Sequence, residues 1–355
     1  MAEKNFKNTT SCELILKGLK KNLRKKRIPH LVIDDLKTVD TSKENKYLFL
    51  VSTNDSYIAI MVRECQKLKI HPIVISLQSI HSIPGIYSSV TPSVDNTMFN
   101  IMSFLKSENK ISPALYGISV NSAPDIARKN CFLQKHVLPT GEEHVYFNHT
   151  GLDDCFKRFF ANISKYDSVI CTNNYAAIHL INNLKKLNYP TSDFIVIGCG
   201  KTLMAAKFYP EIVFAYVVNE NLGKTAVTVL EQLINNTEVL HINMSVKSNI
   251  SRVQNSSSEP LSEDDVVFEE NSSDIFYKDP NIKNMLLIEK LLSICDPTDM
   301  QILDLVLEGS SYEDIANKTF LSQSAIKYRV KNMLQICGCS SKSQFVVFVK
   351  EYMKK

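Results

Sequence analysis

The segment Asp167-Ser-Val-Ile-Cys-Thr-Asn-Asn174, together with the later run Phe194-Ile-Val-Ile-Gly198, decides the fold. Both contain apolar runs that do not alternate with polar residues, which is typical of strands buried on both faces of a parallel sheet. The residues between them, Tyr175–Leu187, are amphipathic with a helical period. A buried strand, a helix and a second buried strand in this order predict a doubly wound α/β fold.

The same alternation extends over residues 1–250. Further apolar runs are predicted as strands: Leu31–Ile33, Tyr47–Val51, Pro72–Ile75, Ala114–Val120 and Phe214–Val218. Amphipathic segments are predicted as the helices between them: Glu13–Arg27, Ile58–Leu68, Leu152–Ile163 and Leu222–Ile234. About 250 residues is long for one such sheet, so the sequence predicts two lobes.

The composition changes after residue 252. Residues 253–277 hold seven acidic residues and no Lys or Arg, a composition typical of a flexible linker. Such a linker has one of two roles. It only tethers the domains on its two sides, or it also binds a basic surface. Residues 281–355 show helical periodicity alone. We therefore expect a ligand-sensing and dimerisation domain over residues 1–252, an acidic linker over 253–280 and a small all-α domain over 281–355.

The overall composition sets the class of protein. With 355 residues, 44% hydrophobic and 22% charged, the chain is typical of a globular protein of two or three domains. It contains neither the roughly 20 apolar residues of a membrane span nor a secretory signal, so we expect a cytoplasmic protein with no membrane partner. The nine cysteines are irregularly spaced and are expected to stay reduced. Scarce arginine and absent tryptophan indicate AT-rich coding, as in low-GC bacteria.

The segments that resemble catalytic motifs are incomplete. Gly200-Lys201-Thr202 and Gly223-Lys224-Thr225 end like phosphate-binding loops, but neither has the preceding glycine that such a loop needs. Asp34 and Asp35 resemble the acidic pair of a phosphorylatable receiver domain, but the later strand that should end in an acceptor aspartate has none. Cys337-x-Cys339 lacks further ligands at metal-binding spacing. The sequence therefore predicts no enzyme, no metal and no cofactor.

The C-terminal residues follow a helix-turn-helix pattern. One helix is predicted to begin after Asp296 and to end at Gly309, and a short second helix to span Glu313–Thr319. Ser322 caps a third helix, whose outer face is polar and basic: Gln323, Ser324, Lys327, Tyr328, Lys331 and Gln335. A short helix, a tight turn and a longer helix with an uncovered basic face are typical of modules that bind double-stranded DNA.

The charge distribution favours this interpretation. Residues 318–355 hold eight bases and one acid, whereas residues 296–314 hold six acids and no base. The positive field therefore concentrates on the half that would meet phosphates. The alternative is a helical module that docks a protein partner through Phe345 and Val349, and whose binding would depend little on salt.

Cys295–Val347 resembles the LuxR-type (GerE) helix-turn-helix. The matching residues are Ile302-Leu303-x-Leu305, Gly309, Asp314-Ile315-Ala316, Phe320-x-Ser322, Ile326-Lys327, Val330, Leu334 and Gly338. The resemblance implies that residues 322–336 are the recognition helix. It places Lys327, Tyr328 and Lys331 toward the major groove.

The sequence departs from this family in three places. Cys295-Asp296 stands where the family has a Leu-Thr opening. Ala325 stands where a threonine is usual, which removes a phosphate contact, and Arg329 stands where a histidine is frequent and is expected to restore one. The residues that we predict to contact DNA are Ser322, Gln323, Ser324, Lys327, Tyr328, Arg329 and Lys331.

The two-lobed part resembles the effector domain of the LacI/galactose-repressor family, which has a periplasmic-binding-protein-like fold. The matching segments are Asp95 at a helix start, Arg128-x-x-Cys131-Phe132, Asp167–Ala177, Phe194–Gly198, Leu222–Ala226 and Arg252. In doubly wound folds, ligands bind beyond the carboxyl ends of the strands. The resemblance implies that a small polar molecule binds there to Asp95, Arg128, Asn173 and Asn174.

This resemblance also has departures. Asn174 stands where the family has aspartate, and Gly200 and Lys201 stand where it usually has acids. With fewer carboxylates the pocket would bind polyols less well, so a different or anionic ligand, or a pocket that has lost its ligand, is an open alternative. For Arg128 the alternative to ligand contact is a structural ion pair or a surface role.

The N-terminal segment differs from that family as well. Ser11–Arg27 already looks like the first helix, so we expect the first strand to be short or missing. Lys17–Arg27 holds seven bases. They form either the solvated face of a helix or an auxiliary nucleic-acid contact.

These patterns together predict a one-component transcription regulator. The two-lobed domain would sense a small polar molecule and residues 322–336 would read DNA. Because a lone helix-turn-helix makes few base contacts, we expect a homodimer. The competing interpretation is a solute-binding or scaffold protein whose C-terminal helices dock a protein partner.

Overall fold

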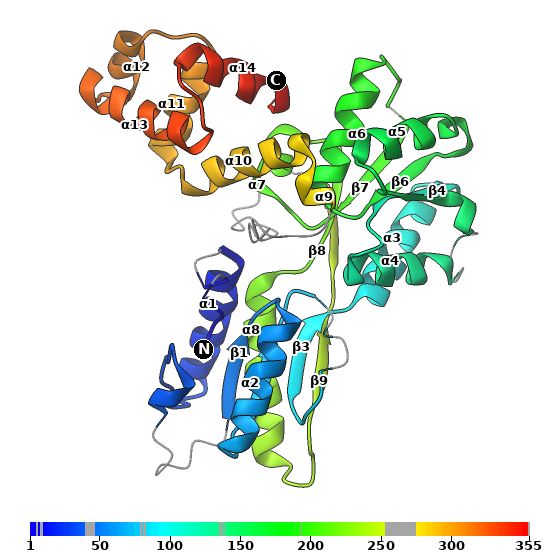
Figure 1. Ribbon diagram of the computed structural model, residues 1–355, viewed down its shortest axis with the longest axis vertical. Helices are drawn as coiled ribbons and strands as arrows, with labels where there is room; N and C mark the ends of the chain where they lie inside the picture. The colour runs from blue at the N-terminus through cyan, green and yellow to red at the C-terminus, as the bar shows by residue number, and fades with distance from the viewer. Residues whose placement is uncertain are drawn as a thin grey trace.

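The computed structural model describes residues 1–4, 6–7, 10–39, 47–78, 80, 83–134, 138, 140–191, 193–252 and 275–353. Two α/β lobes, each with its own sheet, are followed by a group of C-terminal helices (Figure 1). Most of the predicted acidic linker, residues 253–274, lies outside the described part. None of the helices in the described ranges is long and apolar enough to cross a bilayer. The same ranges contain no group of His, Cys, Asp or Glu suited to a metal ion.

The first lobe, at the bottom of Figure 1, has a parallel four-stranded sheet in the order β1-β2-β3-β9. Its strands are β1 (Tyr47–Val51), β2 (His71–Ile75), β3 (Ser88–Pro92) and β9 (Asn243–Val246). On one face lie α1 (Thr10–Lys25) and α8 (Asn219–Asn235), and on the other lies α2 (Asp55–Lys67). Among the described residues at the chain start, a single bridge joins Ala2 to Val51, so the first strand is as short as expected.

The second lobe has a six-stranded sheet in the order β10-β8-β7-β6-β4-β5. Its strands are β4 (Pro113–Ile118), β5 (Val145–Phe147), β6 (Ser168–Cys171), β7 (Ile195–Cys199), β8 (Ile212–Tyr216) and β10 (Asn249–Arg252), of which only β10 is antiparallel to its neighbour. Every residue of β6 and β7 is buried. This confirms the interpretation of the two apolar runs as strands covered on both faces.

Helices cover both faces of the six-stranded sheet. On one face lie α3 (Val94–Ser107) and α4 (Ala123–Leu133). On the other lie α5 (Leu152–Phe160), α6 (Asn174–Lys186) and α7 (Leu203–Phe208). Short 3-10 turns complete the two lobes: η1 (Leu36–Thr38), η2 (Glu142–His144) and η3 (Ile163–Lys165). Because β4 to β8 are parallel, the loops after β4, β5, β6 and β7 all meet at one carboxyl edge.

The chain passes between the lobes after β3, after β8 and between β9 and β10, so neither lobe is one continuous segment. This is the two-lobed, doubly wound arrangement that the sequence predicts. One predicted strand is wrong. Residues 31–33 form no strand, and Leu31 and Val32 are 86% and 65% exposed. Asp35 caps η1 directly after this run, so the chain turns there instead of entering a sheet.

The last part of the chain is helical throughout. Its helices are α9 (Ile275–Lys278), α10 (Pro280–Ile294), α11 (Pro297–Leu307), α12 (Tyr312–Thr319), α13 (Gln323–Ile336) and α14 (Lys342–Tyr352). The predicted starts at Asp296 and Ser322 are confirmed, since each side chain accepts a hydrogen bond from a backbone N–H of the following first turn. The predicted end at Gly309 is also confirmed, where φ is +87°.

Candidate nucleic-acid interface and effector site

α12 and α13 form a short helix, a tight turn and a longer helix. α12 ends at Thr319, and its C-cap Phe320 has the left-handed φ of +58°. Ser322 caps α13 two residues later. The inner side of α13 is buried through Ile326, Val330 and Met333. Because these three residues fix the rotation of the helix about its axis, they also decide which residues face outward.

The outward face of α13 is polar and basic. Its exposed residues are Ser322, Gln323, Ser324, Lys327, Tyr328, Lys331 and Gln335. Lys327 and Lys331 lie one helical turn apart on the same face, and neither forms an ion pair with a described acid. Tyr328, which is 67% exposed, lies beside Lys327. This face can donate hydrogen bonds and positive charge to a polyanion.

Arg329 is engaged in a different way. Its guanidinium donates to Asp296 at 3.0 Å and to Asp299 at 2.6 Å, and so joins α13 to the first turn of α11. These hydrogen bonds raise the pKa of Arg329. A backbone hydrogen bond from Asp299, followed by the Arg329 contact, lowers the pKa of Asp296. In this structure Arg329 therefore fixes the angle between two helices.

At the carboxyl edge of the six-stranded sheet, Asn173 and Asn174 follow β6. Asn173 is the N-cap of α6 and accepts a hydrogen bond from the backbone N–H of Ala176. Asn174 is completely buried, yet neither its Oδ1 nor its Nδ2 has a partner among the described residues. It lies against Gly198, where a Cβ would come within 2.0 Å of the Asn174 Oδ1. Only glycine at position 198 therefore leaves room for this amide.

Asn148, which follows β5 at the same edge, repeats this feature. It is 1% exposed, and both polar atoms of its side chain lack a described partner. A buried amide without a hydrogen bond costs roughly 1–3 kcal/mol, so such groups often mark a place where a water or a ligand completes the contact. Asn148 is a candidate that was not predicted from the sequence, because residues 145–147 were not predicted as a strand. The short apolar run Val145–Phe147, followed directly by a polar residue, was the available signal.

Asp95 and Arg128 lie on the other side of this sheet, on α3 and α4. The Asp95 carboxylate accepts a hydrogen bond from the Cys131 thiol at 2.7 Å. Burial and then Asp95 raise the pKa of Cys131 to about 12. Arg128 forms an ion pair with Asp125 at 2.9 Å. The structure thus places Asp95 against α4, whereas Asn173 and Asn174 lie in the helix layer across the sheet.

A contact that sequence reasoning did not find joins the C-terminal helices to the second lobe. Glu289 of α10 is 5% exposed, and its carboxylate accepts hydrogen bonds from the backbone N–H groups of Leu203, at 2.6 Å, and Met204, at 2.9 Å. Both amides belong to the first turn of α7, just beyond the carboxyl end of β7. The α10 helix is therefore held at the candidate effector edge.

Two further hydrogen bonds extend this junction. Asp279, at the start of α10, accepts from the backbone N–H of Leu152 at 3.3 Å. The Tyr209 hydroxyl after α7 donates to the carbonyl of Tyr352 in α14 at 2.6 Å. Apolar side chains of α10 lie in the same buried cluster as those of α6 and α7. The ribbons of these helices lie close together (Figure 1). The helices that carry α13 are thus packed against the second lobe.

Comparisons with known proteins locate the fold. No protein-family model matches the chain, and no curated protein matches it. The solved structures that are similar to the chain include two regulators. A transcription regulator from Lactobacillus plantarum is 14% identical, with 71% of this chain and 97% of that chain covered and a TM-score of 0.50. The transcriptional regulator CelR in complex with cellobiose is 12% identical, with 71% and 81% covered and a TM-score of 0.52.

A LacI family transcriptional regulator from Mycobacterium smegmatis is also similar, at 13% identity, with 70% of this chain and 96% of that chain covered and a TM-score of 0.47. The likeness to the first two structures shows that the two lobes share the fold of such regulators.

Proposed function

We propose that the chain is a one-component transcription regulator, in which α13 binds double-stranded DNA and the two-lobed domain binds a small polar molecule. The observation that carries the DNA part is the exposure of Lys327, Tyr328 and Lys331 on one face of a helix that follows a shorter helix and a tight turn. Lysines on such a face contact phosphates and base edges in the major groove. The LuxR-type assignment of this module belongs to the proposal.

The effector part of the proposal rests on fold and on unpaired amides. The similar regulator CelR is bound to cellobiose, a molecule rich in hydroxyl groups. In this chain the buried amides of Asn148 and Asn174 each offer a donor and an acceptor that no described residue uses. We propose that a polar ligand binds at the carboxyl edge of the six-stranded sheet, where Asn173 and Asn174 lie at the start of α6 and Asp95 and Arg128 lie on α3 and α4, across the sheet.

The α10 junction suggests how the two parts communicate. Glu289 and Asp279 bind backbone N–H groups in the first turns of α7 and α5, so a ligand that moves these turns also moves α10 and α13. A ligand shifts such an equilibrium only by its difference in affinity for the two states. We propose a homodimer, because two readers on adjacent half-sites double the number of base contacts.

The decisive experiment is selection of genomic DNA fragments by the full chain, beside a Lys327→Ala/Lys331→Ala variant. Each lost contact with a base costs roughly 1–3 kcal/mol, so we expect the variant to bind the selected fragments at least about tenfold more weakly. A Lys283→Ala/Lys290→Ala variant removes the same charge from exposed positions of α10 and should select the wild-type fragments. Equal enrichment by all three proteins would contradict the proposal.

The alternative function, a module that docks a protein partner, was expected to use a surface around Phe345 and Val349. Phe345 and Val349, which the sequence analysis placed on it, are completely buried in the described structure. Salt separates the two functions. DNA affinity should fall steeply as salt rises, because binding releases counterions, whereas an apolar docking contact should change little.

A further inference from the structure

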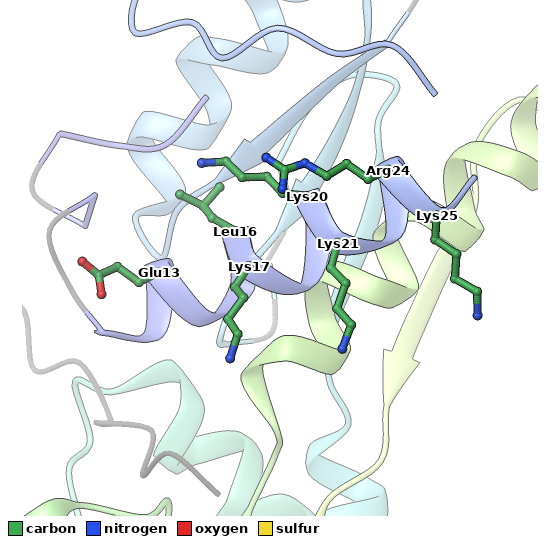
Figure 2. Close-up of a pocket in the computed structure, with 7 residues that line it drawn as sticks. All are labelled: Glu13, Leu16, Lys17, Lys20, Lys21, Arg24 and Lys25. Carbon is green, nitrogen blue, oxygen red and sulfur yellow. The ribbon is translucent and has the colours of Figure 1, made fainter. Parts of the chain in front are cut away.

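The outer face of α1 is an unusually basic surface that the proposed regulator does not explain. Lys17, Lys20, Lys21, Arg24 and Lys25 line an open hollow along this helix, together with Leu16 and a single acid, Glu13 (Figure 2). In the figure, Lys17 and Lys21 point to one side of the helix, and Lys20 and Arg24 form a second row. We call these five bases the α1 basic face.

Two bases of this segment form ion pairs with described acids. Lys17 pairs with Glu220 at 2.5 Å, and Lys26 pairs with Glu231 at 2.8 Å, so both bridges lead to α8. The other four bases of the α1 basic face form no ion pair with any described acid. Four uncompensated charges within two helical turns repel one another, and an anion bound across them would relieve that repulsion.

The helix that carries these charges is held rigidly. Its inner side buries Ile15, Leu19 and Leu23 against α8. Gly18 and Gly223 let the two backbones approach so closely that a Cβ on either would lie 2.1 Å from a carbonyl oxygen of the opposite helix. The backbone that carries the α1 basic face is therefore fixed, so only its lysine and arginine side chains lose freedom when a rigid polyanion binds.

The chemistry of the face selects among polyanions. Lys17, Lys21 and Lys25 recur every four residues, which spaces them by about 6 Å along the helix axis. Phosphates of duplex DNA present a dense, regular row of negative charge that lysine and arginine contact without reading the sequence. A protein partner would instead need a buried apolar centre, and Leu16 is the single apolar residue of the hollow.

We propose that the α1 basic face binds the phosphate backbone of duplex DNA outside the bases that α13 reads. In Figure 1, α1 lies on the same side of the molecule as α12 and α13. The inference deepens the proposed function and rests on it. A second, sequence-independent contact would raise the affinity for all duplexes without changing the preference among them.

The test is a Lys20→Gln/Lys21→Gln/Arg24→Gln variant of the full chain. Its affinity is measured by fluorescence anisotropy across a range of salt concentrations, on a labelled fragment selected by the wild-type protein and on a scrambled duplex of equal length. Each lost phosphate contact lowers the slope of log affinity against log salt by about 0.9, so we expect a slope lower by up to about 2.7. The loss of affinity should be the same factor on both duplexes.

A matched variant, Lys106→Gln/Lys157→Gln/Lys186→Gln, removes the same charge from exposed positions on α3, α5 and α6 and should keep the wild-type slope. Equal slopes for the two variants would overturn the inference. If the wild type preferred its selected fragment while the slopes stayed equal, the proposed function would stand without the phosphate contact of α1. If the slope of the α1 variant were lowered but the wild type showed no preference for its selected fragment, the phosphate contact would stand and the sequence-specific function would be contradicted.

Discussion

His179 shows how one residue connects burial to pH. It lies on α6 with 3% of its surface exposed, and its Nε2 is 2.9 Å from the Asp153 carboxylate. Burial lowers the pKa of His179, and this effect exceeds the opposite influence of Asp153 and Asp279. Lys186 lowers the pKa further. The folded protein therefore takes up a proton at this position less readily than the unfolded chain does.

The first prediction follows from that difference. Because the unfolded chain binds more protons below about pH 6.5, the stability that neutral His179 provides is complete above that pH and is lost as the pH falls through it. Between about pH 7.5 and about pH 5.5, thermal unfolding should show a smaller decrease in Tm for His179→Gln than for the wild type. His30→Gln, at an exposed position, is the control and should behave like the wild type. Equal decreases in all three would contradict this role.

For single residues, the direction of a side chain on its own helix can be predicted from the sequence, whereas its contacts with residues far away in the sequence cannot. The outward direction of Lys327 and Lys331 follows from helical spacing, because Ile326 and Val330 must face the core. The ion pairs of Arg329 could not be predicted, since its partners lie 33 and 30 residues away. The unpaired state of the Asn174 amide likewise depends on Gly198, which only the folded sheet brings near.

Among the elements, the pair of α1 and α8 depends on its two glycines. An added methyl group at Gly18 would lie 2.1 Å from the Glu220 carbonyl oxygen, which is backbone and cannot rotate away. The helices would have to separate, and they would lose contact between Ile15 and Leu222, both of which are fully buried in one cluster. This close contact also holds the α1 basic face in place.

We therefore expect Gly18→Ala to destabilise the first lobe by about 1–3 kcal/mol, the usual cost of overpacking. Amide hydrogen exchange over residues 10–25 should become faster, and the Tm should fall. Lys21→Ala leaves an alanine on the exposed side of α1 and should change the stability by less than about 0.5 kcal/mol. A Gly18→Ala protein as stable as the wild type would mean that the helices are not packed this closely.

The strands show why sequence predicts elements unevenly. The run in β6 is apolar, bounded by polar turns and followed by an amphipathic helix, and each of these signals agrees with a buried strand. Leu31–Ile33 is also apolar over a shorter length, but only Ile33 packs against a buried cluster, and Leu31 and Val32 stay exposed. Apolar composition alone does not show whether a neighbouring element is available to bury a segment.

Over the whole molecule, the C-terminal helices are joined to the second lobe by polar contacts as well as by apolar packing. The two hydrogen bonds to the Glu289 carboxylate involve a charged acceptor, so each is worth more than a neutral one. Helical periodicity predicted α10 but gave no indication that Glu289 is buried, because a charged residue is normally assigned to the solvent side. The position of the reader relative to the effector lobe was therefore not predictable from sequence.

If Glu289 connects the two parts, Glu289→Ala should release α10 from α7. The amides of Leu203 and Met204 would lose their acceptors, at a cost of the order of 1–3 kcal/mol to docking. We expect faster hydrogen exchange in residues 203–208 and 280–294, with exchange in α12 and α13 unchanged because their own core stays intact. Lys290→Ala, on the exposed side of α10, should leave exchange at the wild-type rate. If Glu289→Ala left α7 and α10 equally protected, apolar packing alone would hold the junction, and transmission of an effector signal through this carboxylate would be wrong.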